Sequence, residues 1–256
     1  MLAPQRRVGE RRQRTGVMVN TDPPPATADP RHHSQAQQSP LILLPGLGGD
    51  SRLFGPQRAA FPELVVPSWI EPERNEPLAE YAARFAKVVD PGRACFVGGV
   101  SFGGVVALEV ASHLATRECY LFGSIRDPKE IPTRLRFFRS ISNLVMVPKW
   151  LSPLALRCGG RWLNPSVRGA LHQFKDADDR FLRWAAKAIL TWVPSAGIDR
   201  VRVVQIHGDR DWVFPIGHTS ADKTVAGAGH LVSLTHADEV NQFVRERMSA
   251  ALEAVE

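Results

Sequence analysis

The sequence has little cysteine, no long apolar stretch and no secretory targeting segment. Its three cysteines, Cys95, Cys119 and Cys158, are widely spaced and form no CxxC pair, which argues against a disulfide framework and a cysteine-based zinc site. No apolar run reaches the roughly 18 residues that a membrane-spanning helix requires. Arginine and proline interrupt the first residues throughout, so a secretory h-region is absent. We therefore expect a cytoplasmic protein with reduced thiols, no metal site and no transmembrane segment.

Positive charge is concentrated in two segments. The chain has 32 Lys and Arg against 26 Asp and Glu, a formal net charge of +6. Residues 1–39 hold six Arg and three acidic residues, and residues 127–196 hold 12 Lys and Arg and five acidic residues, whereas the remainder is acidic. Neither basic segment contains an RNA-binding signature or a Cys/His zinc pattern, so we expect no nucleic-acid partner.

Composition divides the chain into a tail, a core and an insertion. Residues 1–39 are rich in Arg, Pro, Gln and Ser, which predicts a disordered basic tail; either Met1 or Met18 could be the true start. Residues 40–126 and 197–256 are predicted to form the core. Residues 127–196 hold four of the six tryptophans and helix-like patterns separated by prolines, which predicts a helical cap or lid insertion.

Within the core, short apolar runs alternate with amphipathic segments. The runs that predict strands are residues 41–44, 64–66, 94–97, 119–122, 201–206 and 224–225. The segments that predict helices are residues 53–60, 78–89, 102–115 and 235–255. This alternation predicts an α/β fold with a mainly parallel central sheet covered by helices on both faces.

The most specific motif is the sequence GVSFGG at residues 99–104, which matches G-x-S-x-G. It stands between a predicted strand and a predicted helix, the context of a nucleophile elbow. In that setting Ser101 lies at the amino-terminal end of a helix, where the positive end of the helix dipole favours developing negative charge. The alternative interpretation is an ordinary glycine-rich turn.

A serine hydroxyl becomes a strong nucleophile only when a general base takes its proton. On this fold an acid and then a histidine are expected later in the chain. Asp209 and Asp211 follow a predicted strand, and His230 ends the loop sequence GAGH at residues 227–230. Simple loop acids and a capping histidine are the alternatives. Three other histidines do not occupy a loop after a strand, because they lie in predicted helices or in the insertion: His113, His172 and His236. His207 and His218 flank the acidic segment, where packing or surface roles are expected.

An oxyanion hole requires preorganised N–H donors. Phe102, directly after the serine, provides one backbone N–H, and the loop PGLGG at residues 45–49 provides the other through Leu47. A tight turn and a phosphate cradle are rival interpretations of this loop. The dinucleotide fingerprint fails because residue 51 is serine, and no Walker lysine follows, so we expect no bound cofactor.

Four stretches, residues 44–49, 99–104, 208–215 and 227–230, together resemble the successive signatures of the α/β-hydrolase superfamily. The similarity spans residues 41–252 and is greatest to small bacterial members akin to carboxylesterases and pimeloyl-carrier methyl esterases. The resemblance implies the α/β-hydrolase fold, with Ser101 as nucleophile and His230 as general base. It also implies that Asp211, rather than Asp209, is the acid that orients His230.

The expected activity is hydrolysis of a small-molecule carboxylic ester through an acyl-enzyme, without a cofactor. A thioesterase or another acyl-carrier-directed hydrolase is the alternative, and a cofactor-free lyase or a non-catalytic binding protein is the alternative of another class. The basic insertion could dock an acidic acyl carrier or an anionic surface, or could simply be a solvated surface. Its basic residues at helical spacing are Arg134, Arg136 and Arg139, and then Arg180, Arg183 and Lys187.

Overall fold

The computed structural model describes residues 39–136 and 165–254. Its centre is a six-stranded sheet in which every neighbouring pair of strands is parallel. The strands are β1 (Leu41–Leu44), β2 (Leu64–Val65), β3 (Cys95–Val100), β4 (Thr116–Phe122), β5 (Val203–Gly208) and β6 (Lys223–Val225). This confirms the predicted α/β class with a parallel sheet.

The strand order is β2-β1-β3-β4-β5-β6. The chain therefore runs outward from β1 to β2 and then returns to the other side of β1 to form β3. In open α/β sheets, ligands bind beyond the carboxyl ends of the strands at such a switch point. The loop after β1 and the turn after β3 meet at this switch point, and these are the two segments that sequence analysis singled out.

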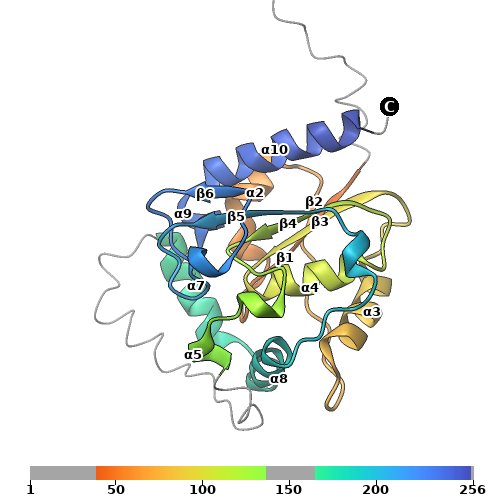
Figure 1. The fold of residues 1–256 in the computed structure, drawn as a ribbon, viewed down its shortest axis with the longest axis vertical. Coiled ribbons are helices and arrows are strands. Elements are labelled where there is room, and N and C mark those ends of the chain that lie inside the picture. Colours follow the sequence, from red (N-terminus) through yellow and green to blue (C-terminus); the bar gives the residue numbers. More distant parts are fainter. Residues whose placement is uncertain (1–38, 137–164, 255–256) are drawn as a thin grey trace, which may run out of the picture.

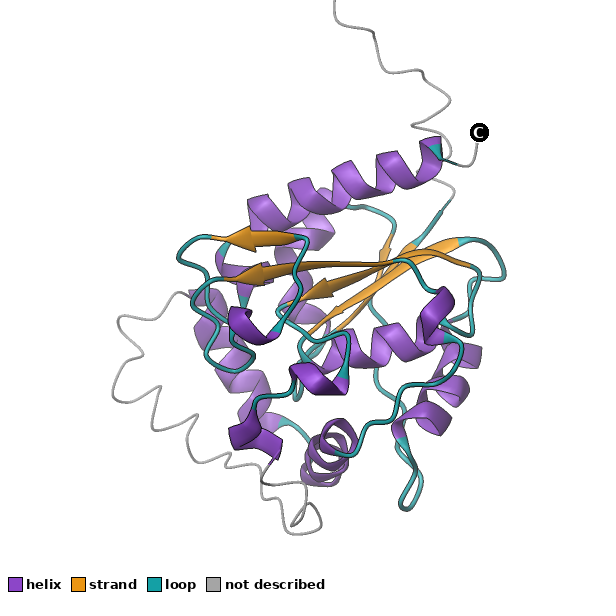
Figure 2. Cartoon of the chain, in the orientation of Figure 1, coloured by secondary structure: helices purple, strands orange, loops and turns teal. Residues whose placement is uncertain are grey.

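Helices cover both faces of the sheet (Figure 1; Figure 2). One face carries α3 and α4, which pack against each other, and the other carries α10, which packs on α2. The helices are α2 (Gly55–Ala60), α3 (Leu78–Val89), α4 (Phe102–Ala111), α5 (Thr133–Arg136), α7 (Pro165–Asp176), α8 (Asp179–Leu190), α9 (Val232–Thr235) and α10 (Ala237–Glu253). The short 3-10 turns are η1 (Ser51–Phe54), η2 (Pro128–Glu130), η4 (Ile198–Arg200) and η5 (Ile216–His218).

The core consists of one apolar cluster on each face of the sheet. All residues of β1 and β3 are buried, which explains their continuous apolar sequences. All ten residues of α4 are buried as well, including Glu109. The Glu109 carboxylate accepts hydrogen bonds from Trp192 Nε1 (2.6 Å) and Ser195 Oγ (2.5 Å). This buried carboxylate therefore holds the segment between α8 and β5 against α4.

Several element boundaries differ from the predictions, and in β4 a buried charge interrupts the apolar pattern. Strand β4 begins at Thr116, three residues before the predicted start at 119, and includes Glu118. The buried Glu118 carboxylate pairs with Arg247 and Arg202, so its charge is compensated inside the sheet layer. Helix α4 ends at Ala111, four residues before its predicted end, and the terminal helix α10 begins at Ala237, two residues after the predicted start and after the separate short helix α9.

Part of the predicted insertion lies against the core. Helix α8 contacts α4, and α7 contacts α9 and η1. Residues 137–164 lie outside the described residues, as do residues 1–38 of the predicted tail; Ser39 is described and buried. The boundaries of the tail and the insertion remain predictions.

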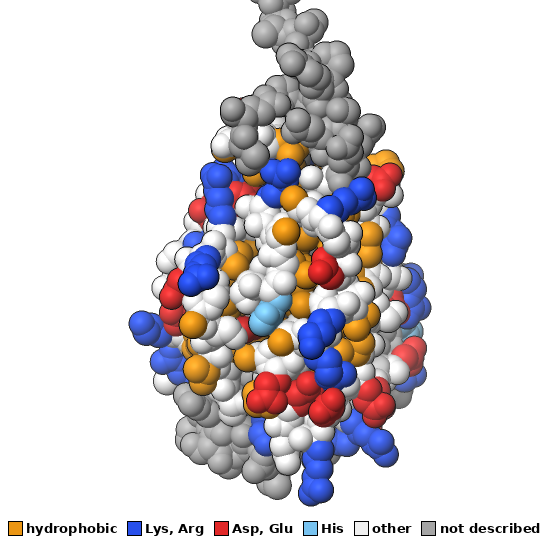
Figure 3. All heavy atoms as spheres, turned by 90° about the vertical axis from the view of Figure 1, so that its right-hand side faces the viewer, with side chains coloured by type: hydrophobic (Ala, Val, Ile, Leu, Met, Phe, Trp, Pro, Cys, Tyr) orange, Lys and Arg blue, Asp and Glu red, His pale blue; other side chains and the backbone are white. Residues whose placement is uncertain are grey.

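Two cysteines are buried and free, Cys95 and Cys119, whereas Cys158 lies outside the described residues. Burial raises the pKa of Cys95 to about 11. In the described part of the chain, every helix is too short or too polar to cross a membrane. Figure 3 shows the side of the molecule at which β3 and β4 begin, where acidic and basic side chains are interspersed. The candidate site lies at the other end of these strands.

Candidate active site

Ser101 occupies a sharp turn between β3 and α4. Its backbone has φ 52° and ψ −123°, a conformation that costs a non-glycine residue on the order of 1–3 kcal/mol. Three hydrogen bonds hold the turn. Ser101 N donates to Phe122 O (3.1 Å), and Ser101 O accepts from Gly104 N (2.9 Å) and from Ser124 Oγ (2.7 Å). The serine is therefore held in a strained geometry by its neighbours, as a nucleophile elbow requires.

The glycines around Ser101 are required by close backbone contacts. A Cβ on Gly99 would lie 2.3 Å from Gly103 O, and one on Gly103 would lie 2.2 Å from Pro45 O. A Cβ on Gly104 would lie 2.5 Å from Ser124 Oγ. Each distance is too short for a real side chain, so the glycine spacing of the motif follows from how tightly α4 packs on β3 and on the end of β1.

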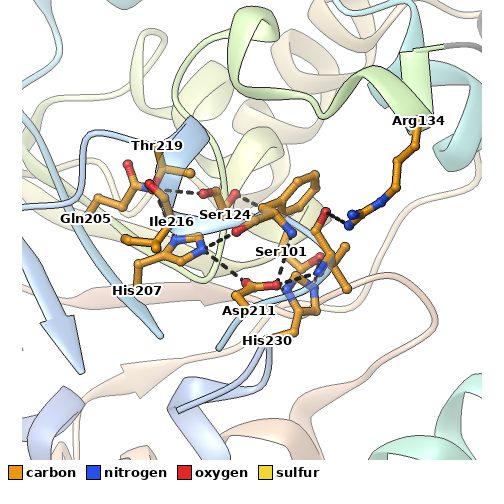
Figure 4. Close-up of polar contacts among 11 residues, drawn as sticks. Ser101, Ser124, Arg134, Gln205, His207, Asp211, Ile216, Thr219 and His230 are labelled. Atoms are coloured by element: carbon orange, nitrogen blue, oxygen red, sulfur yellow. Dashed lines mark hydrogen bonds and ion pairs between the residues drawn. The ribbon is translucent and has the colours of Figure 1, made fainter. Parts of the chain in front are cut away.

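The side chain of His230 connects Ser101 to Asp211 (Figure 4). His230 Nε2 lies 2.9 Å from Ser101 Oγ, and His230 Nδ1 lies 2.8 Å from Asp211 Oδ2. Because Asp211 accepts at Nδ1, the neutral imidazole carries its proton there and leaves Nε2 free to accept the serine proton. The structure thus brings together the serine, the acid and the histidine that the sequence proposed, from three separate loops.

The Asp211 carboxylate is buried and surrounded by donors. Its Oδ1 accepts from the backbone N–H groups of Val213 (2.8 Å) and Phe214 (3.0 Å). Its Oδ2 faces His230 and also His207 Nε2, at 3.1 Å. Burial by itself raises the pKa of Asp211, but the hydrogen bonds from His207 and His230 outweigh it and hold the pKa well below its ordinary value. Asp211 is therefore a carboxylate, suited to stabilising an imidazolium.

The alternative acid, Asp209, has a different position. Its side chain is exposed and accepts a hydrogen bond from Gly227 N at 2.7 Å. It therefore fixes the start of the loop that carries His230, and it is Asp211 that contacts the imidazole. Among the histidines other than His230, the side chains of His113, His172 and His218 are exposed.

The predicted oxyanion donors come from the residue after Ser101 and from the loop after β1. Phe102 is the first residue of α4, so its N–H has no acceptor within the helix. Leu47 belongs to the loop after β1, in which Gly49 N donates to Gly46 O at 2.9 Å. A Cβ on Gly46 would lie 3.7 Å from Ser101 Cβ. The Leu47 loop therefore passes directly beside the serine, although the role of its N–H remains a proposal.

A groove of about 1070 Å³ runs beside this loop, between the segment that follows β2 and helices α7 and α8. Gly48 and Gly49 line it, whereas Ser101 and His230 are not among its lining residues. Its apolar wall contains Trp69, Phe181 and Trp184, whose rings lie 5.7, 6.2 and 6.0 Å from the ring of Phe102. The aromatic wall thus connects the groove to the residue that follows Ser101.

Sequence reasoning missed two polar contacts of the site. His207 was assigned a packing or surface role; it is fully buried and also faces Asp211. Ser124, which holds the Ser101 carbonyl, was not singled out. The signal for His207 was its place in the sequence His-Gly-Asp at the end of a strand, two residues before a candidate acid. Within residues 39–136 and 165–254, no group of three or more His, Cys, Asp or Glu side chains is arranged to hold a metal ion.

Comparison with known proteins identifies the family. Residues 41–243 match the family described as "Alpha/beta hydrolase family", and the chain belongs to it. No curated protein sequence matches the chain significantly.

Solved structures of similar fold include an esterase, MenH and a thioesterase domain. A thermophilic esterase from Thermogutta terrifontis is 18% identical, with a TM-score of 0.62, covering 83% of this chain and 90% of that one. MenH from S. aureus is 14% identical, with a TM-score of 0.62, covering 84% and 94%. The NocB thioesterase domain, in covalent complex with a fluorophosphonate nocardicin G analogue, is 19% identical, with a TM-score of 0.52, covering 86% and 96%. At these identities the likeness establishes the fold and leaves the substrate open.

Proposed function

We propose that this chain is a serine hydrolase that cleaves carboxylic esters, with Ser101 as nucleophile, His230 as general base and Asp211 as the orienting acid. One observation carries the proposal, the continuous hydrogen-bonded series from Ser101 Oγ through the His230 ring to Asp211 Oδ2. The strained turn at Ser101 supports it, because such a turn holds a side chain at the carboxyl end of the sheet.

The reaction follows from the contacts of His230. Ser101 Oγ attacks the ester carbonyl carbon while its proton passes to His230 Nε2. The resulting imidazolium donates through Nδ1 to Asp211, whose charge compensates it. When the C–O bond to the alcohol breaks, His230 returns the proton to the leaving oxygen. Water, deprotonated by the same nitrogen, then attacks the acyl-enzyme, and Ser101 leaves as the protonated hydroxyl with release of the acid.

The tetrahedral intermediates carry a negative oxygen that requires N–H donors. We assign this role to the backbone N–H groups of Leu47 and Phe102. Phe102 directly follows Ser101 at the first turn of α4, and Leu47 belongs to the loop whose Gly46 lies beside Ser101. The amino-terminal end of α4 adds the positive end of its dipole at the same position.

The aromatic lining of the groove favours a substrate with an apolar acyl group. Trp69, Phe181 and Trp184 offer it an aromatic surface next to Phe102. The predicted docking of an acidic carrier receives less support from this part of the molecule. Arg180, Arg183 and Lys187 do line the groove, but four basic residues in all share it with six acidic ones, Asp50, Glu71, Glu73, Glu76, Asp176 and Asp178. A surface of mixed sign favours a neutral ester over an acidic carrier protein.

Matched ester and thioester substrates test the proposal. We would measure kcat/KM for p-nitrophenyl esters and for small-molecule thioesters with the same series of acyl chains, using Ser101→Ala as the control. The proposal predicts turnover of the esters that Ser101→Ala loses. Turnover restricted to the thioesters would replace the ester assignment with a thioesterase, and ester turnover that persists in Ser101→Ala would remove Ser101 from the mechanism.

A further inference from the structure

Two buried polar side chains of β5 lie next to the candidate active site without a part in the proposed reaction. Gln205 and His207 are both fully buried, and they face the same side of the strand because they are two residues apart. Gln205 Nε2 lies 3.3 Å from His207 Nδ1, and His207 Nε2 lies 3.1 Å from Asp211 Oδ2. A series of polar contacts therefore runs from Gln205 to the acid of the site (Figure 4).

The orientation of the Gln205 amide is fixed by its other two partners. Its Oε1 accepts from Arg126 Nε at 2.9 Å, and its Nε2 donates to Ser124 O at 2.8 Å. A guanidinium can only donate and a carbonyl oxygen can only accept. The amide therefore cannot be turned over without losing both bonds, and its N–H₂ group must face His207.

This orientation determines the tautomer of His207. Because Gln205 presents an N–H donor, His207 Nδ1 must be the acceptor and carries no proton in the neutral ring. The proton is then on Nε2, which faces Phe214 O at 2.7 Å as well as Asp211 Oδ2. Phe214 O accepts the hydrogen bond from Nε2–H, and the nearby carboxylate oxygen is also an acceptor, so the tautomer set by Gln205 is the one that this side of the ring requires.

Gln205 also supports the nucleophile. The same Nε2 group that faces His207 donates to the backbone carbonyl of Ser124, and Ser124 Oγ donates to Ser101 O at 2.7 Å. The Gln205 amide is thus connected to two parts of the site: through His207 to the carboxylate of Asp211, and through Ser124 to the backbone of Ser101.

We propose that Gln205 and His207 are positioning residues of the active site: Gln205 holds His207 in the Nε2–H tautomer, so that His207 donates to Phe214 O and keeps its N–H edge 3.1 Å from Asp211 Oδ2, which holds the carboxylate in the orientation that receives His230. This inference rests on the proposed function for its kinetic consequence. Its structural part, the tautomer, does not depend on any activity.

The tautomer is measured directly by two-bond ¹H–¹⁵N correlation spectra of the ¹⁵N-labelled protein. Neutral His207 should show a protonated Nε2 and an unprotonated Nδ1. In Gln205→Glu, which keeps the shape of the side chain but replaces the N–H₂ donor with an acceptor, Nδ1 should become protonated. A wild-type ring protonated at Nδ1, or one that does not respond to Gln205→Glu, would overturn the inference whether or not the protein hydrolyses esters.

Two replacements at His207 separate positioning from packing. His207→Gln keeps an N–H donor near the position of Nε2, whereas His207→Met fills the space without a donor. Loss of the N–H group that faces the charged carboxylate should lower kcat in His207→Met by about 10- to 100-fold, with KM changed less than about twofold, and His207→Gln should recover most of kcat. The exposed His218→Ala is the matched control and should resemble wild type.

The outcomes distinguish this inference from the proposed function. If Ser101→Ala retains ester turnover, the proposed function fails and the spectra alone decide the tautomer. If Ser101→Ala is inactive while His207→Met keeps the kcat of wild type, the positioning role fails alone. Equal losses in His207→Gln and His207→Met, with equal falls in Tm, would show that His207 only fills space and would also overturn the inference.

Discussion

Gly103, in the first turn of α4, packs directly on the carbonyl oxygen of Pro45 at the end of β1. A Cβ at Gly103 would lie 2.2 Å from this oxygen. Because the loop that follows Pro45 carries Leu47, the contact fixes the distance between the nucleophile turn and a proposed oxyanion donor. The second glycine of the G-x-S-x-G motif thus connects the turn that carries Ser101 to the loop that carries Leu47, in addition to allowing the backbone to turn.

Gly103→Ala should therefore damage the fold and the site together. The added methyl group must displace backbone, so we expect a loss of more than about 2 kcal/mol in the free energy of unfolding. Gly169→Ala in α7 is the matched control, because nothing lies within 4 Å of the added Cβ and alanine favours a helix interior by up to about 1 kcal/mol. Urea unfolding measures both variants. Equal stability of the two would contradict the contact.

The choice between the two acids is tested by Asp211→Asn and Asp209→Asn. An amide at 211 favours the wrong tautomer of His230 and cannot compensate the imidazolium, so kcat for the ester should fall on the order of 10³- to 10⁴-fold. Asp209→Asn keeps an oxygen that can accept from Gly227 N and removes only an exposed charge, so it should cost less than about tenfold. Steady-state kinetics with one ester compare them. A larger loss in Asp209→Asn would mean that the acid has been misassigned.

The pKa of Asp211 has a consequence for acid stability. Its folded-state pKa lies below the ordinary value of about 3.9, so the carboxylate stabilises the fold fully above that pH. The contribution is lost as the pH falls from that value toward the lower folded-state pKa. The difference in unfolding free energy between wild type and Asp211→Asn should shrink below about pH 4, by up to about 1.4 kcal/mol per pH unit. Parallel stability curves from pH 6 to pH 2 would contradict this.

The aromatic wall of the groove should influence the choice of acyl chain. Phe181 lies 5.5 Å from the rings of both Trp69 and Trp184, so Phe181→Ala removes the middle of this surface. We expect a lower kcat/KM for long acyl esters, by about tenfold or more, and a smaller change for acetyl esters. Val193→Ala, at an exposed position, is the control. An equal effect on all chain lengths would place the acyl group elsewhere.

Much of this fold could be predicted because its strands are short and its central strands β1 and β3 are fully buried. Runs such as residues 41–44 have no polar face, and the glycines and prolines that end them mark the loops where the site forms. The residues of the site could be predicted from the sequence for a similar reason. Ser101, Asp211 and His230 each follow a strand, and the carboxyl ends of parallel strands meet at one edge of a sheet.

Other features could not be predicted because they depend on contacts between distant residues. Glu118 interrupts the apolar pattern of β4, and its partner Arg247 is 129 residues away. The role of His207 depends on the amide orientation of Gln205, which Arg126 fixes from another segment, 79 residues away. Local sequence patterns carry no information on such pairings. The groove is likewise set by packing between α8 and the segment after β2.

The central claim, that Ser101 is the activated nucleophile, is tested most directly by labelling with a fluorophosphonate probe. Intact-protein mass spectrometry should show one added probe on the folded wild-type protein, and peptide mapping should locate it on Ser101. Ser101→Ala should remain unlabelled, and His230→Ala should react far more slowly, because the hydroxyl then lacks its base. Labelling of folded Ser101→Ala at the rate of wild type, or stoichiometric labelling at another residue, would contradict the account.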